Sequence, residues 1–277
     1  MPDLTPTPRP GPAATGGSDA VLEARGLGLR FGNVVAFDNL DFAVAPGELF
    51  AVIGPNGAGK TSLFNVVSRV YSPTAGSLLY RGRDLLTVRA NRIAASGIAR
   101  TFQNLGLFGQ LTVLENILIG RHHLMRSGAL LGGIYAGFAA AEERTHRQAA
   151  REALAFAGVE RHASTPVALL PYGIRKRVEL ARAVAMEPAL VLLDEPVAGM
   201  SHGERAEVTE LVRRMHGERG LTVLLVEHDM GMVMSVAQRV MVLDFGRRIA
   251  IGTPEEVQRD PEVIRAYLGE PLQERTA

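Results

Sequence analysis

The sequence contains no cysteine, and its positive and negative charges nearly cancel. Without cysteine the chain can form neither disulfides nor cysteine–metal sites. Thirty basic residues against 29 acidic ones leave a net charge of +1, which gives no global field for attracting nucleic acid. We therefore expect no nucleic-acid partner. A hydrophobic share of 47% and a charged share of 21% are those of an ordinary globular protein.

Membrane-spanning and signal segments are missing as well. The longest weakly polar stretch, residues 129–141, would span roughly 20 Å as a helix, short of the ~30 Å hydrocarbon core of a membrane. The first residues are rich in Pro, Gly, Thr and Ala and lack the basic start and apolar core of a signal peptide. We expect a disordered tail over residues 1–19 and a short tail over residues 273–277.

The most informative segment present is Gly54–Thr61, which reads GPNGAGKT. It fits the phosphate-loop template G-x-x-x-x-G-K-[ST], with a short apolar run before it and helical periodicity after it. Glycines let backbone N–H groups turn inward around phosphates, and the start of a helix adds partial positive charge. A glycine-rich turn without a ligand is the alternative, but it does not require a lysine followed by a threonine.

We therefore predict a nucleoside triphosphate site. Lys60 would reach the β- and γ-phosphates, and the Thr61 hydroxyl would ligate Mg²⁺. The other predicted contacts to the nucleotide are Gly54, Pro55, Asn56, Gly57, Ala58, Gly59 and Ser62.

Short apolar strands and helices alternate along most of the chain. The patterns predict strands within 21–44 and at 49–53, 77–80, 190–193 and 222–226, and a hairpin over 240–251. Residues 91–186 read mainly as helices, with the clearest apolar stripe over 142–157, and a last helix covers 261–268. This alternation favours an α/β fold with a mostly parallel sheet covered on both faces and an inserted helical subdomain.

Two carboxylates follow the apolar run Leu190–Leu193. Nucleotide sites of open parallel sheets lie at the carboxyl ends of strands. Asp194 is therefore placed to hold Mg²⁺ through water, and Glu195 to orient and polarise the attacking water. The alternative is an acidic pair that merely caps the next element; the phosphate loop favours the catalytic role.

These segments, in this order, resemble the ATP-binding subunits of ABC transporters. The family signature, usually written LSGGQ, falls at Leu170–Ile174, and Ala181-Arg182-Ala183 follows it on a basic helix. Residues 198–201 resemble the D-loop, and residues 226–229 resemble the switch segment. The resemblance covers about residues 20–270.

The resemblance implies one ABC ATPase domain over residues 20–272. Its fold would be a P-loop NTPase core with a mostly parallel sheet, an antiparallel β subdomain, and an inserted α-helical subdomain over about residues 100–186. The cofactors it implies are ATP and Mg²⁺, and the reaction is ATP hydrolysis coupled to transport of a solute.

The same resemblance gives three further residues a role. Phe31 stands where the family places an aromatic ring against adenine; the alternative is a core phenylalanine. Gln103 corresponds to the Q-loop glutamine, which holds Mg²⁺ or the attacking water; a lone glutamine would otherwise be a surface residue. His228 corresponds to the switch histidine at the γ-phosphate; otherwise it would be structural. The predicted catalytic set is Glu195, His228 and Gln103, and the predicted metal set is Thr61, Gln103 and Asp194.

The signature departs from its usual form, because Pro171, Tyr172 and Ile174 replace serine, glycine and glutamine. In this family the signature of one subunit closes over the ATP of the other, so the Gly173 N–H is expected to contact the partner's ATP. Pro171 supplies neither a hydroxyl nor an N–H group. Ser201 also stands where the D-loop aspartate is commonest. We expect the composite site that uses this signature to be weaker.

Within the family, the chain looks most like the ATP-binding subunits of branched-chain amino acid importers (the LivG type). The similar segments are residues 100–103, 107–108, 111–116 and 260–270 and the Pro-Tyr-Gly form of the signature. This implies membrane permease subunits and a second ATP-binding subunit as partners, with a solute-binding protein as an indirect one. It also implies a peripheral place on the cytoplasmic face of the inner membrane. Residues 127–141 either dock on the membrane subunits or pack within the helical subdomain.

Several other functions fit the same fold. An importer of urea or short amides belongs to the same subtype. Pro171 and Tyr172 argue against a lipid or lipopolysaccharide exporter, whose signature keeps serine and two glycines. A non-transport ABC ATPase usually has tandem domains or a long coiled-coil insertion, and this chain has neither. Glu195 and His228 argue against a nucleotide-binding scaffold without turnover.

Overall fold

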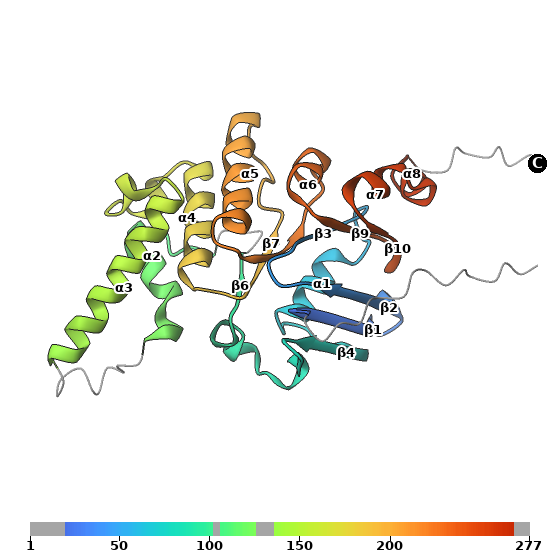
Figure 1. Ribbon diagram of the computed structural model, residues 1–277, viewed down its shortest axis with the longest axis horizontal. Coiled ribbons are helices and arrows are strands. Elements are labelled where there is room, and N and C mark those ends of the chain that lie inside the picture. The colour runs from blue at the N-terminus through green and yellow to red at the C-terminus, as the bar shows by residue number, and fades with distance from the viewer. Residues whose placement is uncertain (1–19, 102–105, 126–135, 269–277) are drawn as a thin grey trace, which may run out of the picture.

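The computed structural model describes residues 20–101, 106–125 and 136–268. Two sheets and the helices that cover them form the part of the molecule around the phosphate loop (Figure 1). The larger sheet has the order β10-β9-β3-β8-β7-β6, with β9, β3, β8, β7 and β6 parallel and β10 antiparallel at the edge. Its strands are β3 (Leu49–Ile53), β6 (Ile98–Arg100), β7 (Leu190–Asp194), β8 (Thr222–Val226), β9 (Arg239–Asp244) and β10 (Arg247–Gly252).

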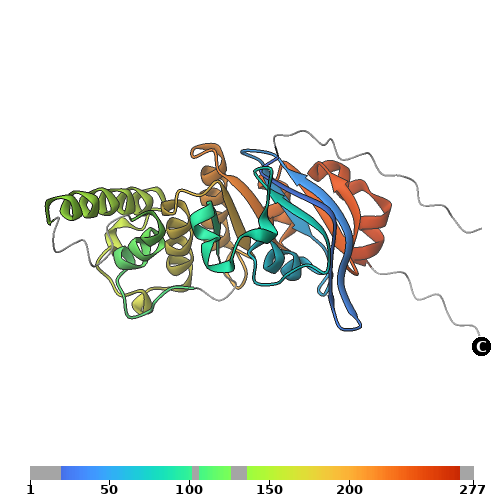
Figure 2. The ribbon, with the colours of Figure 1, turned by 90° about the horizontal axis from the view of Figure 1, so that it is seen from below.

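The smaller sheet is antiparallel, with the order β2-β1-β4-β5. It consists of β1 (Leu22–Phe31), β2 (Val34–Val44), β4 (Ala75–Tyr80) and β5 (Arg83–Asp84). In Figure 2 the long strands β1 and β2, in blue, curve alongside the core of the molecule. The pattern over residues 21–44 thus corresponds to two strands that pair with each other, from Leu22 opposite Val44 to Phe31 opposite Val34.

Both faces of the parallel sheet are covered, which explains why its central strands are apolar throughout. Every residue of β3, β7 and β8 is buried. Leu49, Ala51 and Ile53 of β3 face one apolar cluster, shared with α5 (His202–Gly217) and α6 (Met230–Val236). Phe50 and Val52 face the other, shared with α1 (Lys60–Val67) and the antiparallel sheet. Figure 1 shows α5 and α6 above the strands and α1 below them.

The helical part of the chain lies at the far end from β1 and β2 (Figure 1). It contains α2 (Val113–Gly120), α3 (Ala136–Phe156) and α4 (Tyr172–Ala185), and each of these helices packs against the other two. A capping box between Thr112 and Glu115 begins α2. Lys176 of α4 is fully buried, and its Nζ lies 2.9 Å from Glu179 Oε2. The remaining helices, α7 (Pro254–Arg259) and α8 (Pro261–Leu268), follow β10.

The predicted fold class is confirmed, with one local correction. Residues 91–186 were expected to be mainly helical, but they include the edge strand β6, and several of their turns are 3₁₀ helices. Three residues are too few to show a strand periodicity, and β6 is defined by its pairing with β7, which is distant in the sequence. Within the described ranges, no helix combines the length and the hydropathy needed to cross a membrane.

Candidate active site at the ends of the parallel strands

The phosphate loop joins β3 to α1 and lies between the backbones of two other strands. Gly54 and Gly59 have φ values of 146° and 99°. A Cβ atom on Gly54 would lie 2.0 Å from the carbonyl oxygen of Leu243, at the end of β9, and a Cβ on Gly59 would lie 2.5 Å from that of Ala36 in β2. Only glycine fits both positions. A Cβ on Gly57, by contrast, would meet nothing within 4 Å, so this part of the loop faces open space.

Lys60 begins α1 and turns back into the loop. Its ammonium donates to the carbonyl oxygens of Gly54 at 2.7 Å and Pro55 at 2.9 Å, and the residue is 6% exposed. Burial lowers the pKa of Lys60, and the nearby carboxylates of Glu195 and Asp194 oppose this shift. The first turn of α1 contains no acidic residue. A buried ammonium and an uncompensated helix start therefore point at the same loop, which suits a polyphosphate.

Asp194 ends β7 and is held by an arginine from the neighbouring strand. Its Oδ2 accepts from the Arg100 guanidinium at 3.1 Å, and this guanidinium also donates to Asn65 Oδ1 (2.8 Å) and Ser68 Oγ (2.6 Å). Burial raises the pKa of Asp194, and Arg100 opposes the rise. Arg100 thus connects the acidic strand to the helix that follows the phosphate loop. In the sequence Arg100 only belongs to the similar segment 100–103, and nothing there indicates its contact with Asp194.

Glu195 and His228 leave neighbouring strands at the same edge of the sheet. Glu195 has a left-handed φ of 46°, and its backbone N–H donates to the Val226 carbonyl at 2.9 Å. His228 Nδ1 lies 3.7 Å from Glu195 Oε1. The imidazole is 58% exposed and the carboxylate 20% exposed, so both are open to a ligand in front of the loop. The structure therefore brings together Lys60, Asp194, Glu195 and His228, which are far apart in the sequence.

Comparison with known proteins identifies this arrangement. The sequence model of the family described as ABC transporter matches residues 37–198. A second model, described as branched-chain amino acid ATP-binding cassette transporter, matches residues 247–272. The chain belongs to the ABC transporter family of ATP-binding proteins. Binding of ATP is a property of this family.

Full-length relatives agree with the family models. The high-affinity branched-chain amino acid transport ATP-binding protein LivG of Escherichia coli (strain K12) is 39% identical, over 91% of this chain and 99% of its own. The ADP conformation of MJ1267, an ATP-binding cassette of an ABC transporter, superposes with a TM-score of 0.78 at 29% identity, over 91% of this chain and 99% of that one. A dimeric cassette, MJ0796 with ADP and phosphate, has a TM-score of 0.69 at 25% identity, over 84% and 98%.

The predicted adenine contact of this ABC ATP-binding protein lies on the antiparallel sheet. Phe31, the last residue of β1, is 46% exposed, so it is not a core residue. Its ring stands edge-on to Tyr71, with 5.1 Å between the ring centroids. Tyr71 was not predicted, because it lies in a loop after α1 and comes near Phe31 only in the fold. Because the Phe31 side chain is nearly half exposed, it remains accessible to a base.

Of the remaining predicted nucleotide and metal contacts, Thr61 and Ser62 lie in the described part of the chain and Gln103 does not. Thr61 and Ser62 lie in the first turn of α1, where Thr61 is exposed and Ser62 partly exposed. Gln103 lies outside the described residues. In the described part of the chain, no group of three or more His, Asp or Glu side chains could enclose a metal ion. A metal here would depend on Thr61, Asp194, water and the nucleotide itself, which is the mode that Mg²⁺ prefers in phosphate sites.

The segment that resembles the ABC signature packs against the start of α5. Tyr172 begins α4, and its hydroxyl donates to the Ala198 carbonyl at 3.4 Å. A Cβ on Gly173 would lie 2.6 Å from Glu204 Oε1, so a carboxylate is packed directly on the signature glycine. Ser201, at the position of the D-loop aspartate, caps α5 and pairs with Glu204 in a capping box. The Ser201 hydroxyl is the main cause of the lowered pKa of Glu204, and the Gly173 N–H adds to it.

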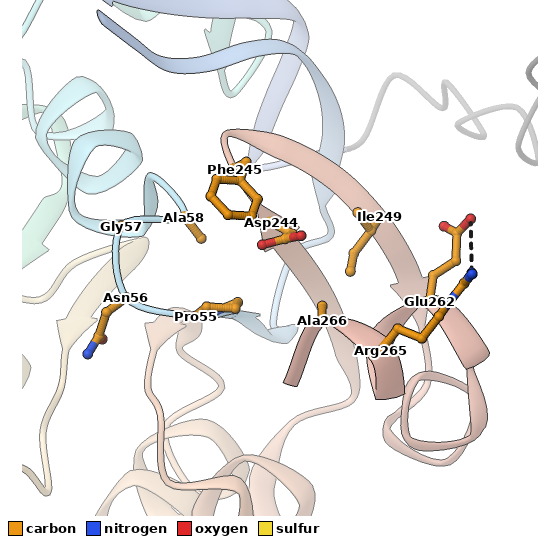
Figure 3. Close-up of a pocket in the computed structure, with 10 residues that line it drawn as sticks. All are labelled: Pro55, Asn56, Gly57, Ala58, Asp244, Phe245, Ile249, Glu262, Arg265 and Ala266. Carbon is orange, nitrogen blue, oxygen red and sulfur yellow. Dashed lines mark ion pairs between the residues drawn. The ribbon is translucent and has the colours of Figure 1, made fainter. Parts of the chain in front are cut away.

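A cavity of about 670 Å³ lies outside the phosphate loop (Figure 3). The loop forms one wall and α8 the other, with Phe245 at the tip of the β9–β10 hairpin. Arg265 and Glu262 of α8 form an ion pair at its rim, 4.0 Å apart. Part of the segment that the second family model matches, Ile249 and residues of α8, thus lies across this cavity from the phosphate loop.

Proposed function

We propose that this chain is the ATP-hydrolysing subunit of an importer for branched-chain or other hydrophobic amino acids. The observation that carries the proposal is the convergence of Lys60, Asp194, Glu195 and His228 at one edge of the parallel sheet. Support for the cargo comes from the name of the E. coli relative and from the C-terminal match over residues 247–272.

Binding of the nucleotide would use groups that already face the loop. The ammonium of Lys60 would exchange the Gly54 and Pro55 carbonyls for phosphate oxygens, which are stronger acceptors because they are charged. The N-terminus of α1 would stabilise the same negative charge, and the Phe31 ring would stack on the base. These residues hold and orient ATP, so that its terminal phosphate lies in front of Glu195 and His228.

Mg²⁺ would be held by the Thr61 hydroxyl and, through water, by Asp194, with Gln103 as the third predicted contact. Bound there, it would neutralise charge that develops on the phosphates. Arg100 already fixes the Asp194 carboxylate in one orientation, at 3.1 Å from its Oδ2. The chain thus supplies an oriented oxygen donor set rather than a closed metal cage.

Hydrolysis would depend on Glu195 and His228. The Glu195 carboxylate would orient an attacking water and polarise its O–H bond. His228 would donate to the terminal phosphate and hold the water on the line of attack. Their separation of 3.7 Å, from Nδ1 to Oε1, lets both side chains reach one site.

Transport requires membrane permease subunits, and a second cavity of the structure is a candidate docking site for them. A cavity of about 650 Å³ lies between the sheet end of β6 and the helical part, and Ile93, Ile119 and Arg182 are among its lining residues. Arg100 and Gly106 also line it. We assign this groove to a segment of the membrane permease subunits. A second ATP-binding subunit would complete a closed dimer over both nucleotides, on the cytoplasmic face of the membrane.

The first test is ATP hydrolysis by the complex purified from its own membranes. Glu195→Gln should lower kcat by roughly 10²-fold or more, since it removes the group that orients the water, while the Kd for ATP changes little. A matched control is Glu210→Gln, which alters an exposed carboxylate on α5. Unchanged hydrolysis in the Glu195 variant would contradict the proposed function.

The second test concerns the partners and the cargo. A tagged chain should co-purify with two membrane permeases and a second ATP-binding subunit, and deletion cells should lose uptake of labelled leucine. Loss of urea or acetamide uptake, with leucine uptake intact, would assign the chain to the importers of short amides instead. Recovery of ribosomes or repair factors in place of permeases would rule out both importers.

A further inference from the structure

A buried carboxylate links the two segments that carry the predicted catalytic side chains. Glu227 is 0% exposed and ends the run that leads from β8 to His228. Its Oε1 accepts from the backbone N–H of Val197 at 3.0 Å. Its Oε2 accepts from the backbone N–H groups of His228 at 2.9 Å and Asp229 at 3.2 Å. Each oxygen therefore serves a different part of the chain.

Val197 belongs to the turn that carries Glu195. The Ala198 N–H donates to the Glu195 carbonyl at 3.2 Å, which closes a tight turn around Val197, and Glu195 itself has the left-handed φ of 46°. A displacement of the Val197 N–H therefore moves Glu195 as well. On the other side of the carboxylate, the bonded N–H groups are those of His228 and its neighbour. The positions of both catalytic side chains thus depend on one carboxylate.

A buried charge of this kind is retained only when it is well hydrogen-bonded. Removing a carboxylate from water is unfavourable, and three N–H donors offset that loss. A neutral side chain could not accept from both segments with two equivalent oxygens. We infer that Glu227 is a positioning residue, which sets the register between Glu195 and His228 and so the geometry of water attack. The inference rests on the proposed function, because it assumes those two catalytic roles.

The link continues toward the signature of the same subunit. Ala198, next to Val197, accepts from the Tyr172 hydroxyl at 3.4 Å. The start of the signature helix, the turn after β7, Glu227 and His228 are therefore joined by consecutive hydrogen bonds. Glu227 is the member of this series that has no other assigned role in binding or hydrolysis.

The variant Glu227→Gln tests the inference in the complete complex. The glutamine amide has one oxygen and one NH₂ group, so it can accept from the Val197 N–H or from the N–H groups of His228 and Asp229, but not from both. Its NH₂ group would then face a backbone N–H on the other segment, and the two segments would move apart. Misplacement of catalytic groups by about 1 Å costs up to ~10²-fold in rate. We expect kcat to fall at least tenfold by this estimate, while ATP affinity, which depends on the phosphate loop, stays within about twofold. Glu227→Asp, which is one methylene shorter and cannot reach both segments, should likewise lower kcat and leave ATP affinity nearly unchanged.

A double substitution separates positioning from a general structural role. If Glu227 acts by placing His228 and Glu195 together, then Glu227→Gln should lower kcat by a smaller factor in a His228→Ala background than in the wild type, because only the position of Glu195 remains to be disturbed. Full additivity of the two losses would overturn the inference. So would a wild-type kcat in Glu227→Gln, or failure of both Glu227 variants to fold, because the contacts would then serve folding rather than register.

Glu48 offers a matched control at the opposite end of the sheet. It is 7% exposed, and its Oε2 accepts from the Ala45 N–H at 2.7 Å, just before β3 begins. Glu48→Gln should lower thermal stability while kcat stays at the wild-type value. Failure of the inference is also distinguishable from failure of the proposed function. In the first case Glu195→Gln still abolishes hydrolysis and Glu227→Gln does not lower it; in the second, Glu195→Gln itself has no effect.

Discussion

Two surfaces of this subunit are predicted to meet ATP, and they are built differently. The own-nucleotide surface (Lys60, Asp194, Glu195 and His228) comes from the ends of adjacent parallel strands and the loop after β3. The signature surface (Tyr172, Gly173, Ser201 and Glu204) comes from the starts of α4 and α5. On the first surface a buried ammonium faces the loop. On the second, a carboxylate already lies against the glycine that should meet the partner's phosphate.

The difference concerns how much each surface must change when ATP arrives. Strand ends fixed by a buried sheet hold their catalytic groups in place, and of the own-nucleotide side chains only the Lys60 ammonium has to exchange its acceptors. Such preorganisation favours efficient electrostatic stabilisation. Glu204 would face a phosphate of like charge at Gly173, and it must move away before the signature can bind. We therefore expect substitutions on the own-nucleotide surface to abolish binding or chemistry, and those on the signature surface to affect mainly closure of the dimer.

The largest effect should follow Lys60→Ala. Loss of the ammonium leaves the Gly54 and Pro55 carbonyls facing the phosphates without a cation, so ATP binding should weaken strongly and hydrolysis should fall by roughly 10²–10³-fold. Equilibrium binding of a fluorescent ATP analogue and phosphate release measure the two quantities. Arg213→Ala removes the same charge from an exposed site on α5 and should leave both at wild-type values. Near-normal ATP affinity in Lys60→Ala would contradict the expectation that ATP binding depends on the own-nucleotide surface.

A smaller effect should follow Gly173→Ala. The new methyl group would lie 2.6 Å from Glu204 Oε1, and Glu204 is held in its capping box with Ser201. We expect ATP affinity of the isolated chain to be unchanged, while ATP-driven dimerisation and hydrolysis fall about tenfold, by analogy with the loss of a contact worth ~1–2 kcal/mol. Analytical ultracentrifugation with ATP and a Glu195→Gln background measures dimerisation.

Gly203→Ala is the matched control for that glycine. It also lies in a helix, but a Cβ there meets nothing within 4 Å. Dimerisation should be unaffected, and stability should rise by about 0.5–1 kcal/mol from helix propensity. Equal losses in the two glycine variants would show that the position of Glu204 is irrelevant.

The smallest effect concerns stability rather than activity. Because the folded-state pKa of Asp194 is raised, its contribution to stability is fully present below the unfolded pKa and is lost as pH rises through the folded pKa. At neutral pH the charged form therefore destabilises the nucleotide-free fold. Asp194→Asn should raise the Tm in a thermal scan at pH 7 without ATP.

Asp229 serves for comparison, because its pKa is lowered in the fold whereas that of Asp194 is raised. The Met232 N–H at the start of α6 is the main cause of its lowered pKa, so its contribution is present above the unfolded pKa and lost as pH falls through the folded one. Asp229→Asn should lower the Tm at pH 7. A rise in Tm for Asp229→Asn, or a fall for Asp194→Asn, would contradict the physical account of these two carboxylates.

Local sequence predicted where the parts of the own-nucleotide surface lie, because each follows an apolar strand, whereas the role of His228 came from the family resemblance. Lys60, Asp194 and His228 each come after a buried run, and parallel strands bring such ends to one edge. The predicted strand over 222–226 and the predicted hairpin over 240–251 agree with β8, β9 and β10. Periodicity and turn residues were sufficient here, since neither depends on distant contacts.

The contacts between these parts could not be predicted, because they depend on how distant segments pack. Nothing local indicates that Arg100 reaches Asp194, that Tyr71 stands against Phe31, or that Glu204 covers Gly173. Glu227 was missed for a different reason. In the sequence it is only the neighbour of His228 in the switch segment. Its complete burial and its hydrogen bonds to backbone N–H groups of two segments appear only in the fold.

The chain has only two lysines among its 30 basic residues, and the fold encloses both. Lys60 is 6% exposed within the phosphate loop, and Lys176 is 0% exposed inside α4. Acylating reagents such as succinimidyl esters therefore find no lysine amine on the surface of the native protein. Any lysine acylation reports a transient opening, and occupancy of the loop by nucleotide should protect one of the two sites and not the other.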